Sequence, residues 1–128
     1  MAIEEAHTTT GGRELEPIGN LMFENDDVAV WALELQPGDS TGWHKHDHPY
    51  LMIVLEGDSV VAEFDSDIDE LEAPTPAGRV MLSDASINSP WEAENAHNRT
   101  ATRFREIVVE LKNVTRKVDY LEADGFVD

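Results

Sequence analysis

Short runs of strand-forming residues recur along this chain, and turn-forming residues separate them. The runs are rich in β-branched and aromatic residues, and they are VAVWALEL (28–35), YLMIVLEG (50–57), SVVAEF (59–64), FREIVVEL (104–111) and two weaker ones, GRVML (78–82) and AENAHNRT (93–100). Gly57-Asp58, between two of the runs, is typical of a tight hairpin. Short strands at intervals of roughly 8–12 residues are typical of sandwiches and barrels. The pattern therefore predicts an all-β, antiparallel fold.

The chain divides into three predicted parts. Its 128 residues suit a single domain, and a chain of this length can bury a core without disulfides. The predicted strands place the barrel domain at residues 20–112. Residues 1–19 form a polar N-terminal segment that is either loose or adds an edge strand to a partner. Residues 113–128 form an acidic tail, in which we expect no more than one short turn.

The charge balance is strongly acidic, and it excludes several classes of partner. Asp and Glu number 27 against 9 Lys and Arg, which gives a net charge of −18. Such a surface repels nucleic acids and anionic membranes, so neither is an expected partner. An acid-rich, lysine-poor surface also suits a salty cytoplasm, where screening weakens the repulsion between the acids.

The chain contains no cysteine, which excludes disulfides, thiolate metal sites and a cysteine nucleophile. Its first residues lack the apolar run of a signal peptide. No stretch approaches the roughly 18 apolar residues of a membrane span. We therefore expect a soluble, cytoplasmic protein.

Three of the five histidines stand two residues apart in STGWHKHDHPYLMIVLEG. They are His44, His46 and His48, and Tyr50 follows at the same spacing. If the stretch is one strand, these side chains share a face. Imidazoles that converge inside a barrel need hydrogen-bond partners or a metal, and Zn, Fe, Mn, Ni and Cu all accept imidazole nitrogen. The spacing alone leaves open the alternative of a histidine-rich outer surface.

The spacing around these histidines resembles the first sequence motif of the cupin family. That motif is a glycine, five residues, His-x-His, three residues, a glutamate, six residues and a second glycine. Gly38, His44, His46 and Gly57 occupy its positions. Tyr50 stands where the family has its glutamate.

The second cupin motif contains Pro-x-Gly, then a histidine, then an asparagine after three further residues. Its best match here is PWEAENAHN, in which Pro90 and Asn98 fit. Glu92 replaces the glycine and Glu94 replaces the histidine. His97 is out of phase with Glu94 by one residue, so an uninterrupted strand points it to the opposite face, and only a bulge reverses this.

The resemblance covers about residues 28–111, and it implies a small double-stranded β-helix, a jelly-roll-like barrel with a metal in its mouth. It implies His44 and His46 as metal ligands. Glu94, at the position of the family's histidine, is the expected third ligand. His97 and His48 are the alternatives to Glu94.

The remaining residues of the implied site are expected to line the pocket or to orient the ligands. They are His48, Tyr50 and Asn98. Tyrosine is protonated at neutral pH, so Tyr50 is better suited to hydrogen-bond a substrate or a histidine than to bind a metal. Nitrogen and oxygen ligands without sulfur favour Fe, Mn, Ni or Zn over Cu(I).

The resemblance leads to two functional hypotheses, because cupin-like barrels host enzymes as well as binding proteins. The first is a cupin barrel that binds a divalent metal and acts on an unidentified small organic molecule. The changes at positions 50 and 94 leave open the second, a non-catalytic ligand-binding or sensing barrel with a degenerate metal site. In either case we expect a homodimer, because the edge strands of an open barrel must be covered.

Overall fold

The computed structural model describes residues 8–9, 11–84, 87, 89–114, 118 and 123–126. These residues contain no helix, and their paired strands are antiparallel. The strands are β1 (Asn20–Glu24), β2 (Val28–Leu35), β3 (Ser40–His44), β4 (Tyr50–Glu56), β5 (Ser59–Phe64), β6 (Leu71–Pro74), β7 (Arg79–Ser83), β8 (Glu94–His97), β9 (Phe104–Leu111) and β10 (Ala123–Phe126). The prediction of an all-β, antiparallel fold is confirmed.

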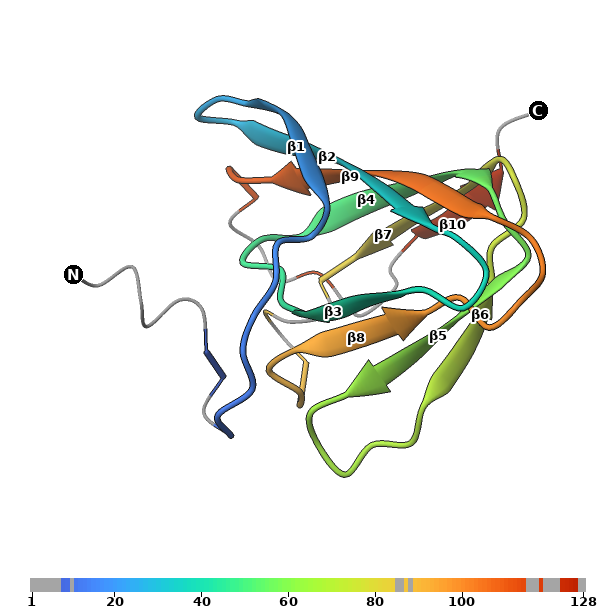
Figure 1. Cartoon of the computed structure of the whole chain (residues 1–128). Helices are drawn as coiled ribbons and strands as arrows, with labels where there is room; N and C mark the ends of the chain where they lie inside the picture. The colour runs from blue at the N-terminus through green and yellow to red at the C-terminus, as the bar shows by residue number, and fades with distance from the viewer. Residues whose placement is uncertain are drawn as a thin grey trace.

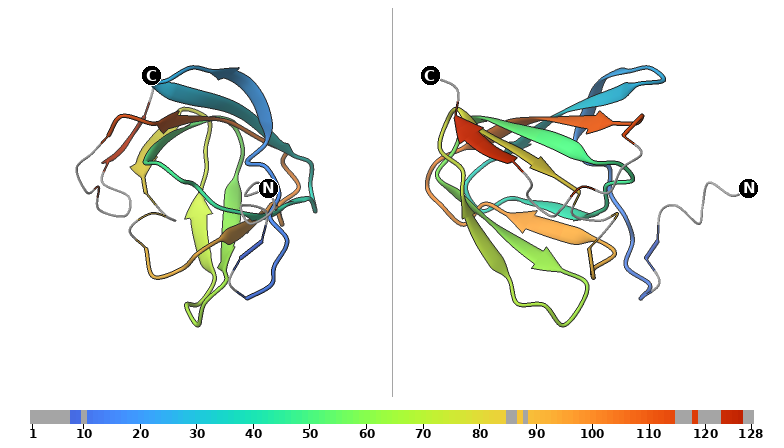
Figure 2. Two further views of the ribbon diagram at one scale, coloured as in Figure 1. Left: turned by 90° about the vertical axis from the view of Figure 1, so that its left-hand side faces the viewer. Right: turned by 180° about the vertical axis from the view of Figure 1, so that it is seen from behind.

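The strands form two facing sheets, which Figure 1 shows one above the other and Figure 2 shows from the side and from behind. The larger sheet has the order β1-β2-β9-β4-β7-β10, and the smaller has the order β3-β8-β5-β6. β2 and β9 pair along their whole lengths, from Val28 opposite Leu111 to Leu35 opposite Phe104. Both strands lie inside the larger sheet.

The core lies between the two sheets, and the alternation of side chains along each strand builds it. On β9, residues 104, 106, 108 and 110 are buried, whereas residue 105 is exposed. Two apolar clusters fill the space, one of Ile18, Tyr50, Phe64, Trp91 and Val108 and the other of Leu35, Val54, Met81 and Phe104. Burial of one such side chain contributes about 1.5–3 kcal/mol to stability.

The two glycines that frame the histidine stretch are explained by the backbone around them. Gly38, in the turn between β2 and β3, has a φ of 90°, which side chains with a Cβ rarely adopt. Its N–H donates to the carbonyl of Asn98 at 2.7 Å. At Gly57, a Cβ would lie 2.6 Å from the carbonyl oxygen of Thr75. Both positions therefore exclude larger residues for reasons of fold.

The described part of the N-terminal segment packs against the barrel of its own chain. Leu15 and Ile18 are buried, and the N–H of Glu16 donates to the carbonyl of Trp43 at 2.6 Å. The guanidinium of Arg13 lies 4.1 Å from the centre of the Trp43 ring. In Figure 1 this segment, in blue, runs along one side from the smaller sheet to β1. A loose segment is thus not what the structure has at residues 11–19; residues 1–7 lie outside the described residues.

The C-terminal part contributes a strand that the sequence does not indicate. β10 pairs antiparallel with β7, from Ala123 opposite Leu82 to Phe126 opposite Arg79. The sheet therefore extends beyond the boundary expected at residue 112. In the part of the chain that the structure describes, no helix has the length and hydropathy that a membrane crossing needs.

Candidate metal centre

The histidine stretch is two strands with a loop between them, and not the single strand that the spacing suggested. β3 ends at His44 in the smaller sheet, and β4 begins at Tyr50 in the larger sheet. Residues 45–49 cross from one sheet to the other and are not part of a strand. Strand alternation therefore does not place His46, His48 and Tyr50 on the face of His44. The loop decides where each of them lies.

Three side chains from this region nevertheless meet at one buried point. The Oε1 atom of Glu94 lies 3.5 Å from Nε2 of His44 and 3.5 Å from Nε2 of His46. His44 and Glu94 face each other across the β3–β8 ladder, and His46 follows from the loop. Both histidines are almost completely buried. We call these three residues the triad.

The local structure of β3 fixes the ring of His44. A bulge interrupts the pairing with β8 between Ser40 and Trp43, and Gly42 within it has a φ of 79°. The carbonyl of Gly42 and the hydroxyl of Thr41 each lie 3.1 Å from Nδ1 of His44. Since the carbonyl can only accept, Nδ1 is the nitrogen that carries the proton in the neutral ring. Nε2 then presents its lone pair to Glu94.

His46 is held by a ring contact. Its imidazole stacks on the phenol ring of Tyr50, with centroids 3.6 Å apart and an angle of 11° between the planes. The rings of His44 and His46 meet edge to face, with centroids 5.2 Å apart. Nδ1 of His46 has no hydrogen-bond partner among the described residues. Tyr50 thus packs against one face of the His46 ring and fixes its orientation.

The electrostatics of the triad favour a cation between its members. Burial alone would raise the pKa of Glu94, but hydrogen bonds from His44 and His46 and their charges hold it far below its usual range. Burial lowers the pKa of His46. Burial opposes a charge on His44 too, but the hydrogen bond and charge of Glu94 raise its pKa overall. The carboxylate is therefore ionised, and its contact with each imidazole nitrogen needs a proton or a metal ion between the two atoms.

The triad also fits a metal ion in its dimensions. Ligands about 2.0–2.1 Å from a tetrahedral ion lie roughly 3.4 Å from one another. The two printed contacts of Glu94 are 3.5 Å, and the three ligand atoms all lie within 4.8 Å of one another. A backbone carbonyl that fixes the second nitrogen, as Gly42 does for His44, is typical of metal-bound histidines. The donor set of two imidazoles and one carboxylate suits a divalent ion with open positions.

The triad borders a cavity of ≈ 150 Å³ between the two sheets. Apolar side chains form most of its wall, among them Leu33, Met52, Val60, Met81 and Val108. Tyr50 also lines it. The site thus combines the polar triad with a mostly apolar cavity, and this combination is typical of small-molecule pockets.

A second acidic side chain of the cavity, Glu106 on β9, was missed in the sequence. It is 7% exposed and lines the same cavity. Burial, with the charge of Glu94 as a second cause, raises its pKa to about 8. A signal was available, because Glu106 shares the strand parity of the apolar residues Phe104 and Val108.

Two predicted pocket residues do not line the cavity. His48 is half-buried in the loop before β4 and is not among the cavity residues. Asn98 is fully buried but serves the fold: its Nδ2 donates to the carbonyls of Leu35 at 3.0 Å and Thr102 at 2.9 Å. Its Oδ1 accepts from the N–H and the hydroxyl of Thr100. Asn98 therefore ties the loop after β8 to the end of β2.

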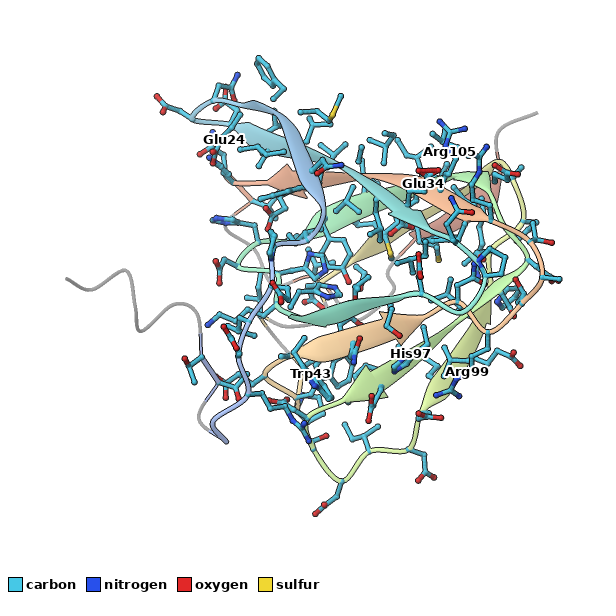
Figure 3. The ribbon with its side chains drawn as sticks, in the orientation of Figure 1. Glu24, Glu34, Trp43, His97, Arg99 and Arg105 are labelled. Carbon is cyan, nitrogen blue, oxygen red and sulfur yellow. The ribbon has the colours of Figure 1, made fainter. Side chains whose placement is uncertain are left out.

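His97, the other alternative ligand, lies away from the triad. β8 pairs with β5 without a bulge, so His97 points to the opposite face from Glu94. Its ring contacts Ser40 at 2.6 Å and Glu63 at 3.0 Å. Glu70 lies close by, but Arg99 binds both of its carboxylate oxygens. In Figure 3, His97 at the end of β8 and Arg99 in the loop after it lie near each other. This group is an ion-pair network of the outer face.

Comparison with solved structures identifies the fold. The chain superposes with a TM-score of 0.62 on a cupin domain from Bordetella pertussis Tohama I, at 21% identity, over 74% of this chain and 92% of that one. The TM-score is 0.55, at 18% identity, for an uncharacterised protein with a double-stranded β-helix domain from Klebsiella pneumoniae, with 100% and 96% covered. For an RmlC-like cupin from Methanocaldococcus jannaschii it is 0.53, at 12% identity, with 73% and 78% covered.

These likenesses define the class of protein: the chain is a small protein with the cupin fold, a double-stranded β-helix. The prediction made from the histidine spacing is thereby confirmed at the level of the fold. No family model and no curated protein matches the chain. A fold does not determine a function, which depends on the geometry and chemistry of the site.

Proposed function

We propose that this protein binds one divalent metal ion through His44, His46 and Glu94 and acts on a small organic molecule in the adjoining cavity. The observation that carries the proposal is the convergence of two buried imidazole nitrogens on one ionised carboxylate oxygen, each at 3.5 Å. A bound divalent ion would supply Lewis acidity at this point. Fe, Mn, Ni and Zn all suit the donor set.

The residues around the triad have separable tasks in this proposal. The Gly42 carbonyl keeps the proton of His44 on Nδ1, so that Nε2 remains available. Tyr50 holds the ring of His46 by stacking. The apolar wall excludes water, which strengthens electrostatic interactions inside the cavity.

The proposal is tested by the metal content of the purified chain after incubation with Zn²⁺ and removal of free ion. We expect about one ion per chain for the wild type and almost none for the double variant His44→Ala/His46→Ala. His97→Ala is the matched control, because it removes a histidine from the outer face, and it should retain the ion. Unchanged metal content in the double variant would refute the ligand assignment. A wild type that retains no added ion would identify the barrel as a non-catalytic binding protein.

A further inference from the structure

The two buried glutamates of β9 differ in whether a partner satisfies them, and only Glu106 lines the cavity. Glu106 and Glu110 lie on the same face of β9, and both are buried. Glu110 accepts a hydrogen bond from Nε1 of Trp31 at 2.8 Å. Glu106 has no hydrogen bond and no ion pair with any residue in the described part of the chain. The two glutamates therefore form a matched pair, one with a structural partner and one without.

The residues directly opposite Glu106 on the neighbouring strands are apolar. Its partners across the sheet are Leu33 on β2 and Val54 on β4, both apolar. A buried carboxyl group without a partner costs folding free energy. Burial raises the pKa of Glu106 to about 8, so its carboxyl group is mostly protonated at neutral pH and can donate a hydrogen bond. A ligand in the cavity that hydrogen-bonds the Glu106 carboxyl group would explain why this group is buried without a protein partner.

We propose that Glu106 is a ligand-contacting residue and that the cavity takes a short hydroxy or oxo carboxylic acid. This inference rests on the proposed function, because one oxygen group of the acid lies at the triad and another accepts a hydrogen bond from Glu106. The apolar side chains of the same cavity accommodate the carbon chain.

Charge and size select this class of molecule. A divalent ion together with the Glu94 carboxylate leaves one positive charge, which a monoanion neutralises in the buried site. The cavity volume of ≈ 150 Å³ is comparable to that of an apolar cavity that binds a molecule the size of benzene. A chain of about four or five carbons with two oxygen groups fits such a volume.

The first test compares matched acids by calorimetric titration of the Zn²⁺-loaded protein. The probes are 3-hydroxybutanoate and 4-oxopentanoate, each against the acid that lacks the extra oxygen, butanoate and pentanoate. The wild type should prefer the oxygenated acid of each pair about three- to tenfold, which is the value of one hydrogen bond. In Glu106→Leu this preference should fall to about one, while His97→Ala should keep it. Equal binding by the wild type, or an unchanged preference in Glu106→Leu, overturns the proposal.

The second test needs no ligand and no metal. In the presence of a chelator at pH 7, Glu106→Leu should raise the Tm, because it removes a buried polar group that has no partner. Glu110→Leu should lower the Tm, because it leaves Nε1 of Trp31 without its acceptor. A fall in Tm for Glu106→Leu like that for Glu110→Leu shows a structural role and overturns the proposal. If the wild type retains Zn²⁺ but shows no preference among the acids, this inference fails while the proposed metal site stands.

Discussion

Glu94, which stands where the cupin motif has a histidine, gives the triad a fixed negative charge. A neutral imidazole in this place would leave the site without a fixed negative charge. The Glu94 carboxylate is ionised, and it lies at hydrogen-bonding or ion-pairing range of two buried imidazoles. A carboxylate at this position therefore adds a charge that attracts cations.

Glu94→Gln should weaken the binding of Zn²⁺ by at least about tenfold, because the amide keeps the size of the side chain but loses the charge. A competition titration with a chromophoric chelator measures the affinity. Glu63→Gln is the control, since Glu63 contacts His97 on the outer face, and it should bind as the wild type does. Equal affinities for Glu94→Gln and the wild type would contradict a role for Glu94 as a ligand.

Glu106 should make the stability of the metal-free protein depend on pH. Its folded-state pKa, about 8, lies above the unfolded value of 4.5. The stability that its proton contributes is fully present below pH 4.5 and is lost as the pH rises towards 8. Urea denaturation in the presence of a chelator should show Glu106→Gln gaining stability over the wild type from pH 5 to pH 8. A constant difference between the two proteins over this range is the contrary result.

The element scale shows what strand periodicity can and cannot predict. Residues 28–35 and 104–111 predict strands because their content of β-branched and aromatic residues is a local property of the sequence. Alternation failed at residues 44–50, because the chain changes sheets there and the parity of a strand does not extend through a loop. The structure nevertheless brings His44 and His46 together at Glu94, because the loop returns His46 to the side of His44. The spacing of the cupin motif implies this arrangement, whereas strand alternation does not.

Two further differences have non-local causes. The pairing of β10 with β7 depends on a contact between distant parts of the chain, and no local pattern in the acidic tail marks it. Asn98 fits a family motif, but its role became clear only from the carbonyls of Leu35 and Thr102, which lie on other segments. Glu106 was overlooked because a charged residue in a predicted strand is ordinarily assigned to the solvent face.

β1 is the element best suited to contact a second copy of the chain. It forms one edge of the larger sheet, all five of its residues are exposed, and three of them in a row are apolar: Leu21, Met22 and Phe23. An exposed apolar edge strand favours pairing with another strand. We therefore expect a homodimer in which β1 pairs with β1 of the partner subunit.

Multi-angle light scattering tests this assembly. The wild type should have the mass of a dimer at tens of micromolar, in low and in high salt, and Leu21→Asp/Phe23→Asp should have the mass of a monomer. Leu55→Asp removes an exposed apolar residue from β4 and should leave the dimer intact. A monomeric wild type under all these conditions would contradict the expectation.

At the scale of the whole molecule, repulsion among the acids is the dominant long-range force. The net charge is −18, and three of the described basic side chains already pair with acids: Arg99 with Glu70, Arg103 with Glu56 and Lys112 with Glu24. Most carboxylates therefore have no cation of the chain nearby. Salt must supply the screening that the sequence lacks.

The Tm should consequently rise with the concentration of KCl. Between 0.1 M and 2 M we expect an increase on the order of 5 °C, which corresponds to about 1 kcal/mol for a domain of this size. Differential scanning calorimetry measures the change, and KCl is preferred over sulfate because sulfate also strengthens apolar burial. A Tm that stays flat over this range would show that the repulsion is unimportant.

Because the N-terminal segment packs into the barrel, the folding unit of this protein begins before its first strand. Ile18 belongs to the main apolar cluster and also lines the cavity, although it precedes the first strand of the barrel. The backbone N–H of Glu16 donates a hydrogen bond to the carbonyl of Trp43. The barrel strands alone therefore do not form the whole wall of the cavity. A barrel that begins at its first strand would lack Ile18, and part of its core and cavity would be exposed to water.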